Sequence, residues 1–156
     1  MEVIATRVTA YLADRLRQID QANGYPLTLS KVEVGQFYED LPQPAPLPIA
    51  TLVAASTGDA VTPEGVVLSG RRARVYQVEV VIDFDQHPDT ERHALLDQVE
   101  WGIARSLRGR PPPQLAGLLQ SVALGDVQFN YPAPGHSVAI VQAQVAVTFV
   151  EQYPQP

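Results

Sequence analysis

The feature that most constrains the fold is a long strand-like segment near the C-terminus that carries no charged side chain. Residues 137–150 read SVAIVQAQVAVTFV, in which large apolar residues alternate with small or polar ones. A period of two is typical of a β-strand whose two faces meet different surroundings. The wet face of an antiparallel sheet normally carries polar and charged residues. We therefore predict that something other than water covers this strand, and that the cover is a neighbouring copy of the same chain.

Two other segments have the spacing of helices. Residues 2–22 and 88–108 repeat apolar residues every three to four positions, which predicts one buried face on each helix. Asn23-Gly24 supplies a stop signal for the first helix, and Pro88 suits the first turn of the second. The two apolar stripes consist of Ile4, Val8, Tyr11, Leu12, Leu16 and Ile19, and of Leu95, Leu96, Val99, Ile103 and Leu107.

Strand signals fill the rest of the chain. Between the helices we predict three strands, over 29–37, 49–55 and 72–84, and the last of these has the strongest alternation. After the second helix, 121–131 and 136–150 predict a closing hairpin. The result is one α+β domain over residues 1–156. Its order is α-β-β-β-α-β-β, with two helices packed on one side of a mostly antiparallel sheet.

Three segments lie outside these elements. The proline-rich stretch 42–48 favours extended backbone and predicts a connector or an arm. Residues 56–70 are rich in glycine, proline and serine and predict a long loop between two paired strands. The last residues predict a short flexible C-terminal tail.

Bulk composition narrows the function. The 156 residues include no cysteine, which removes thiolate catalysis and disulfides and fits a reducing cytoplasm. The formal net charge is −6, which disfavours nonspecific binding to nucleic acid. The longest uncharged stretch, 127–150, is broken by prolines and glutamines, so no membrane-spanning segment is expected.

Little in the sequence favours catalysis. Asp83, Asp85 and His87 share one face at the end of a predicted strand, which could bind a metal or transfer protons. A solvated strand end before a helix N-terminus explains the same residues and is the favoured interpretation. Motifs for a serine nucleophile, a phosphate loop or a dinucleotide fold are missing. We therefore expect no enzyme, no catalytic residue, no cofactor and no metal.

The arginines and the tryptophan are candidates for contacts. Arg71, Arg72 and Arg74 predict one basic patch, and Arg105, Arg108 and Arg110 predict another. Pairing with carboxylates, inside or between subunits, is favoured over binding phosphate. The single tryptophan could anchor a subunit contact or be a partly buried core residue. The interface candidates are Arg71, Arg72, Arg74, Trp101, Arg108, Gln142 and Gln144.

Several segments together carry a resemblance that covers nearly the whole chain. They are I-x-x-x-V-x-x-Y-L-x-x-x-L-x-x-I followed by N-G-Y, V-x-V-G-x-F-Y, P-I-A-T-L-V, R-x-Y-x-V-E-V-V-I, H-A-L-L-D-Q-V-E-W-G-I-A-R-S-L and A-Q-V-A-V-T-F-V-E-Q-Y. This pattern of elements resembles the tail terminators of long-tailed bacteriophages, also called tail completion or minor tail proteins. The resemblance implies a small α+β subunit.

The resemblance also implies a function in the virion tail, after assembly in the host cytoplasm. Six copies would form a homo-oligomeric ring on the end of the tail tube protein, stop its polymerisation and offer a surface to the head-tail connector protein. We expect the 56–70 loop, with Arg71 and Arg72, to dock onto the tube. Genomic DNA would pass through the channel without specific binding, helped by acidic residues such as Glu64, Asp83 and Asp85.

Other functions remain open at this point. A head-tail joining protein, or neck adaptor, of the same particle would use the same ring but contact the portal side. An enzyme built on Asp83, Asp85 and His87 would hold a metal. A DNA-binding module would use the arginine patches and would bind in a salt-dependent way.

Overall fold

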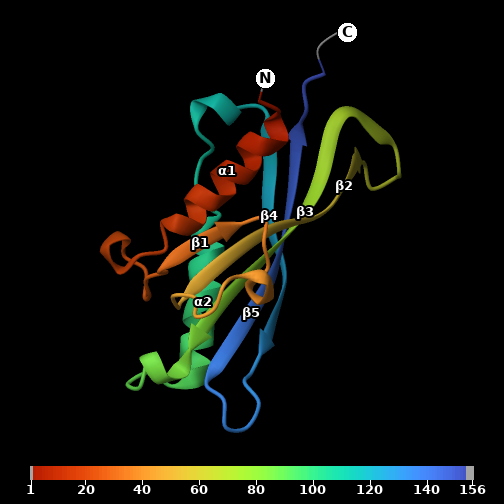
Figure 1. The fold of residues 1–156 in the computed structure, drawn as a ribbon. Coiled ribbons are helices and arrows are strands. Elements are labelled where there is room, and N and C mark those ends of the chain that lie inside the picture. Colours follow the sequence, from red (N-terminus) through yellow and green to blue (C-terminus); the bar gives the residue numbers. More distant parts are fainter. Residues whose placement is uncertain (1, 154–156) are drawn as a thin grey trace.

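The computed structural model describes residues 2–153 and confirms the predicted class and order of elements. Two α-helices and five strands alternate as α-β-β-β-α-β-β, with short 3-10 turns between them (Figure 1). The long elements are α1 (Ile4–Arg17), β1 (Lys31–Val34), β2 (Ile49–Val61), β3 (Val67–Asp83), α2 (Arg92–Ser106), β4 (Leu119–Asn130) and β5 (Val138–Val150). The 3-10 turns are η1 (Gln21–Asn23), η2 (Tyr38–Asp40), η3 (Phe84–Gln86) and η4 (Pro113–Leu115).

The five strands form one mixed sheet in the order β1-β2-β3-β5-β4. Only β1 and β2 run parallel, and the other neighbours are antiparallel, as the sequence predicts. The last strand pairs with β3 on one side and β4 on the other, so β5 is an interior strand. The interior position explains why the side chains on one face of β5 are uncharged, because that face packs under the helices. They are Ala139, Val141, Ala143, Val145, Val147 and Phe149.

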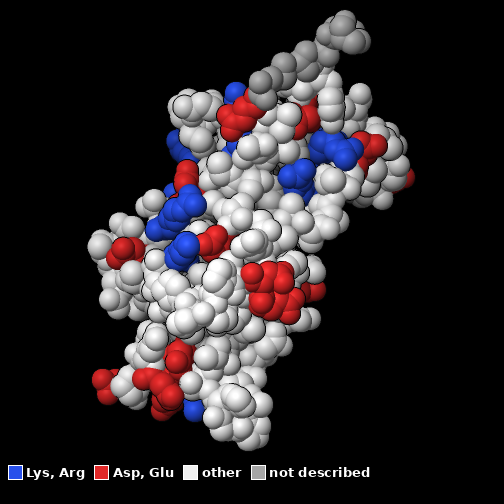
Figure 2. All heavy atoms as spheres, in the orientation of Figure 1, with Lys and Arg blue, Asp and Glu red and all other residues white. Residues whose placement is uncertain are grey.

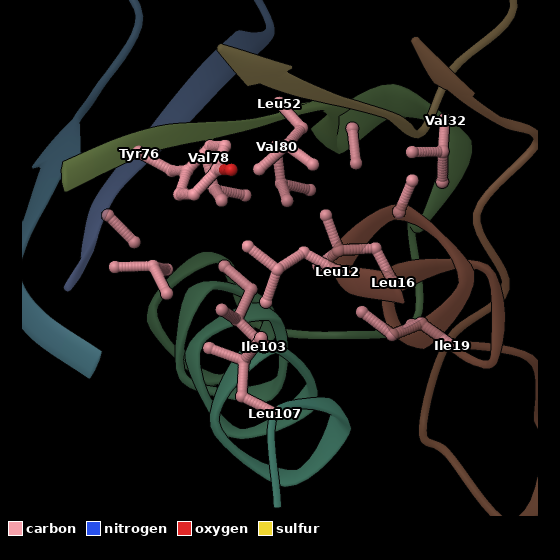
Figure 3. Packing of buried hydrophobic residues seen from close by; sticks show 14 of the residues in the cluster. Leu12, Leu16, Ile19, Val32, Leu52, Tyr76, Val78, Val80, Ile103 and Leu107 are labelled. Atoms are coloured by element: carbon pink, nitrogen blue, oxygen red, sulfur yellow. The ribbon is translucent and has the colours of Figure 1, made fainter. Parts of the chain in front are cut away.

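Both helices lie on the same face of the sheet, here called the inner face. Figure 3 shows Leu12 and Leu16 of α1 and Ile103 of α2 pointing toward Val78 and Val80 of β3. These side chains are almost completely buried, and each contributes about 1.5–3 kcal/mol relative to an exposed one. The apolar stripes predicted for the two helices therefore form the main core.

The N-terminus of α1 is capped from the far end of the chain. Its own N-cap residue, Val3, has no side-chain oxygen to offer. The carboxylate of Glu151 accepts hydrogen bonds from the backbone N–H groups of Ile4 and Ala5, at 3.0 and 3.1 Å. A carboxylate at this position also interacts favourably with the helix dipole. The end of β5 is thereby tied to the start of α1.

Both helices are shorter than predicted, and short polar side chains explain why. The side chain of Asp20 accepts a hydrogen bond from the N–H of Ala22 and starts η1, so α1 ends at Arg17 instead of residue 22. Asp83 likewise accepts from the N–H of Asp85 and starts η3. As a result α2 begins at Arg92 and not at Pro88. Side chains of this kind compete with regular helix at such positions.

The proline-rich connector is a cover for the outer face of the sheet. Residues 36–48, here called the strap, link β1 to β2 across the side opposite the helices. Leu41, Ile49 and Val81 form a second buried cluster there, with Val138 and Ile140 packed against it. The predicted cover for β5 is thus supplied in part by the chain itself. The prediction of a neighbouring copy over the whole outer face of β5 is wrong for this end of the strand.

The predicted 56–70 loop is a continuation of the hairpin. Strand β2 runs on to Val61, and β3 begins at Val67, with Val61 paired to Val67. Beyond Arg71 the hairpin has no third strand, because the pairing of β3 with β5 stops there. We call this two-stranded extension, residues 59–70, the arm. Figure 1 shows it projecting from the sheet on the side away from α1.

The ends of the chain add little to the fold. The short tail predicted at the C-terminus falls largely on residues 154–156, which lie outside the described residues. Within residues 2–153, neither helix has both the length and the apolar character needed to cross a membrane.

Candidate assembly surfaces

A buried carboxylate holds the strap against the sheet. Glu79 is only 7% exposed and faces the outer side of the sheet. It accepts hydrogen bonds from the N–H of Tyr38 at 3.2 Å, from the hydroxyl of Thr51 at 3.3 Å and from the amide of Gln142 at 3.2 Å. Buried carboxylates need such partners. Gln142, a predicted interface residue, therefore has an internal role.

Next to this network the outer face is open and rich in glutamine. A hollow of about 110 Å³ is lined by the side chains of Gln77, Asp126, Gln128, Gln142 and Gln144, together with Ala143. Gln144 is exposed, and the outward positions after it on β5, Ala146 and Thr148, are small and uncharged. This part of the outer face has no cover within the described residues. A polar surface with a single charged residue, Asp126, suits a wet contact with another protein.

The first predicted arginine patch is divided between two faces. Side chains alternate along β3, and Arg72 and Arg74 fall on the inner side while Arg71 falls on the outer side. Arg72 forms an ion pair with Asp59 across the hairpin, with 2.6 Å between its Nη1 and the Oδ1. Pairing with a carboxylate is what the sequence favours for this residue. The three arginines do not act as one patch.

Arg74 is fixed at the upper end of the core. Its guanidinium lies 5.8 Å from the ring centres of both Tyr76 and Phe149, which is within range of a cation–π interaction. Its Nη1 donates to the hydroxyl of Tyr76 at 3.4 Å, and Tyr76 in turn bonds to Thr9 of α1. The Nε atom of Arg74 is buried without a hydrogen-bond partner among the described residues.

Trp101 stands on the outward side of α2 and is 51% exposed, so it is not a core residue. Its ring meets that of Tyr25 edge to face, with 6.1 Å between the ring centres. The guanidinium of Arg105 lies over both rings, at 4.4 Å from Tyr25 and 5.3 Å from Trp101, and donates to the carbonyl of Gly24. The exposed ring of Trp101 and the buried Tyr25 border a shallow hollow beside Pro26. Exposed, rigid aromatic groups are common anchors of protein contacts.

The residues of the second predicted arginine patch are all exposed around the end of α2. Arg105 is occupied by the aromatic pair, whereas Arg108 and Arg110 are exposed beyond the end of α2. On the face shown in Figure 2, basic side chains stand in separate groups with acidic ones between them. This distribution gives no continuous basic surface of the kind that holds a phosphate backbone.

Of the acidic pair and histidine at the end of β3, Asp83 has a structural role. Asp83 caps η3, Asp85 is exposed, and His87 is half-buried with its Nε2 atom unpartnered. Among residues 2–153, no three histidine, aspartate or glutamate side chains gather in a way that could hold a metal ion.

Sequence reasoning missed a group of three exposed valines at the end of the arm. Val61, Val66 and Val67 at the end of the arm are 56%, 60% and 58% exposed. The turn between them is ordered: the N–H of Thr62 bonds to the carbonyl of Val66, and Gly65 adopts a φ of +85°. The signal that could have found it was the Val-Val pair after Pro-Glu-Gly, which suits a strand better than a loop.

Comparisons with known proteins add nothing about function. No family model matches the chain, and no curated protein matches it. One solved structure aligns with 96% of this chain and 98% of its own, at 18% sequence identity and a TM-score of 0.45. A likeness at that level carries no argument.

Proposed function

We propose that copies of this chain close into a ring on the end of a bacteriophage tail tube. The ring stops the addition of tube subunits and gives the connector of the head a surface to bind. The observation that supports this most is the arm, a two-stranded extension without a core of its own that ends in three exposed valines. Apolar side chains grouped in water indicate a contact with another protein.

The positions of the exposed surfaces support a ring rather than a symmetric pair. The arm, the open outer face around Gln144 and the aromatic hollow around Trp101 lie on different parts of the molecule. A ring subunit needs several different surfaces. Each contact between neighbouring copies joins one patch of one copy to a different patch of the next, and the tube and the connector bind further patches. The α+β fold and its order of elements are also those that the tail-terminator resemblance implies.

In this proposal the protein acts in the virion tail after assembly in the host cytoplasm. Genomic DNA passes through the ring, and an acidic chain with scattered arginines does not grip it. A ring of six copies carries six times the net charge of −6. No step of this function requires a cofactor.

Growth of tail tubes in the presence of the chain tests the proposal. Preformed tubes of the cognate tube protein are mixed with free tube subunits, with and without the chain, and tube lengths are measured by negative-stain electron microscopy. We expect tubes to stop growing and to carry extra density at one end. Equal growth in both samples would count against the proposal. Binding only to tubes already closed by another ring would instead support the neck adaptor.

A further inference from the structure

A groove beside α1 is shaped for an inserted apolar segment. It has a volume of about 500 Å³ and lies between α1, the end of β1 and Arg74. Its apolar walls include Val3 and Val34, which are 49% and 42% exposed. Ala10 and Ala13 of α1 add small side chains that leave room for a partner.

The groove and the tip of the arm share one chemistry. Together they hold five of the eight large apolar side chains that are exposed among the described residues. The tip, residues 61–67, presents three exposed valines, while the groove joins apolar side chains to two threonines and two arginines. Burying apolar surface on both partners would recover about 25 cal/mol for each Å² removed from water.

Their charges are also complementary. The groove is lined by two arginines, Arg17 and Arg74, and by no acidic residue. The tip contains one acidic residue, Glu64, and no basic one. Arg17 is already paired with Asp14 at the surface, whereas Arg74 and Glu64 make no ion pair within residues 2–153. Arg74 is therefore the groove cation that is left for a carboxylate of a partner.

The tip cannot fill the groove of its own chain. Figure 1 shows the arm projecting away from α1, and a hairpin of fixed register cannot fold back across the sheet. The occupant that matches in shape, polarity and charge is the arm of a second copy. Contacts between two unlike patches repeat from copy to copy, and such a contact closes into a ring when the rotation permits.

We infer that the arm tip of each copy inserts into the groove between α1 and β1 of the next copy, as the head-to-tail contact of the assembly. This inference rests on the proposed ring and assigns its subunit contact. It replaces the sequence-based expectation that segment 56–70 docks onto the tube. Arg17 and Arg74 then face the Glu64 of a neighbouring copy.

Disulfide trapping tests the contact, because the chain has no cysteine of its own. One chain carries Val66→Cys at the tip and a second carries Val34→Cys in the groove. Both side chains are exposed, so neither substitution disturbs the core. The matched control pairs Val66→Cys with Gln120→Cys, which is exposed at the edge of the sheet. Mixtures are oxidised mildly, and the products are separated by non-reducing electrophoresis.

The expected result is a mixed dimer of the tip and groove chains that forms at least about tenfold faster than the control, since association raises the effective concentration of the two thiols. A chain with both cysteines should give a ladder of covalent multimers. A rate equal to the control would overturn the inference, as would selective trapping of the tip on tube protein. Trapping is measured without tubes. A covalent ladder from a chain that does not stop tube growth would therefore contradict only the proposed function. A chain that stops tube growth but is trapped at the control rate would contradict only this inference.

Discussion

Tyr11 links α1 to the segment that follows α2 and makes stability depend on pH in the alkaline range. Its hydroxyl donates to the carbonyl of Gly109 at 3.1 Å. Burial raises the pKa of this hydroxyl above its ordinary value of 10.0, while nearby Arg15 lowers it by a smaller amount. The folded state therefore holds the proton more tightly than the unfolded state. Its contribution to stability is complete below pH 10 and is lost as the pH rises through the folded pKa.

The Tyr11→Phe variant checks this linkage. At pH 8 the variant should be less stable by about 0.5–1.5 kcal/mol, because the carbonyl of Gly109 loses its donor. Above pH 10 the difference from the parent should shrink. The reason is that Tyr11 ionises more readily in the unfolded parent than in the folded parent, whereas phenylalanine cannot ionise. Urea unfolding at both pH values measures the difference, with the exposed Tyr131→Phe as control. A difference that does not change with pH would contradict the assignment.

We predict that the side chain of Glu79 holds the strap against the sheet. Replacing Glu79 by alanine removes the acceptor for Tyr38, Thr51 and Gln142 at once. We expect the free energy of unfolding to fall by about 1–3 kcal/mol, because buried donors are left unpaired. The control is Glu39→Ala on the exposed side of the strap, which should change it by less than about 0.5 kcal/mol. Equal effects of the two substitutions in urea unfolding would show that Glu79 does not anchor the strap.

At the scale of elements, the arm should serve assembly and not stability. Replacing Val61, Val66 and Val67 by threonine keeps the strand preference and shape of the side chains but makes the tip polar. The melting temperature should move by less than about 2 °C, since exposed positions contribute little. The same variant should fail to stop tube growth. A variant with parental activity on tubes would show that the valines are not contact residues.

The aromatic hollow offers an internal probe, because Trp101 is the only tryptophan of the chain. Half of its side chain is exposed in the single chain. The exposure of Trp101 predicts that this side of α2 faces another subunit. Assembly should then remove water from the indole side chain and shift the tryptophan fluorescence to shorter wavelength. The variant with three threonines at the arm tip, which should stay unassembled, is the control. An unshifted spectrum in assembled rings would place Trp101 outside the subunit contacts.

The periodic elements were predictable from the sequence, and the irregular ones were not. Two periodic patterns predicted residues of the core correctly, because each has a period that only one kind of element satisfies. They are the helical stripe from Ile4 to Ile19 and the strand alternation from Tyr76 to Phe84. The strap was missed because its cover over Val81 depends on contacts distant in sequence. The arm was missed because glycine and proline in residues 56–70 outweighed its valines.

The candidate site was harder to predict for the same reason. Counting arginines suggested patches, but alternation along β3 sends Arg71 and Arg72 to opposite faces. Gln142 was found for its place on an uncharged strand, yet its amide is used by Glu79. The exposure of Trp101 follows from the packing of whole elements and has no local sequence signal.

At the scale of the whole molecule, the inner face of the sheet is covered by its own helices, whereas the arm and part of the outer face have no cover within residues 2–153. The strap covers one end of the outer face, so the remaining open area lies near Gln144 and the arm. The molecule therefore has distinct surfaces on which a closed assembly can be built.

The most direct test of the ring is a cryo-electron microscopy reconstruction of tail tubes with the chain bound. The account predicts a single closed ring of copies at one end of the tube, with the arm of each copy against α1 of the next. Copies bound along the length of the tube, or single copies at the end without contact to one another, would contradict it.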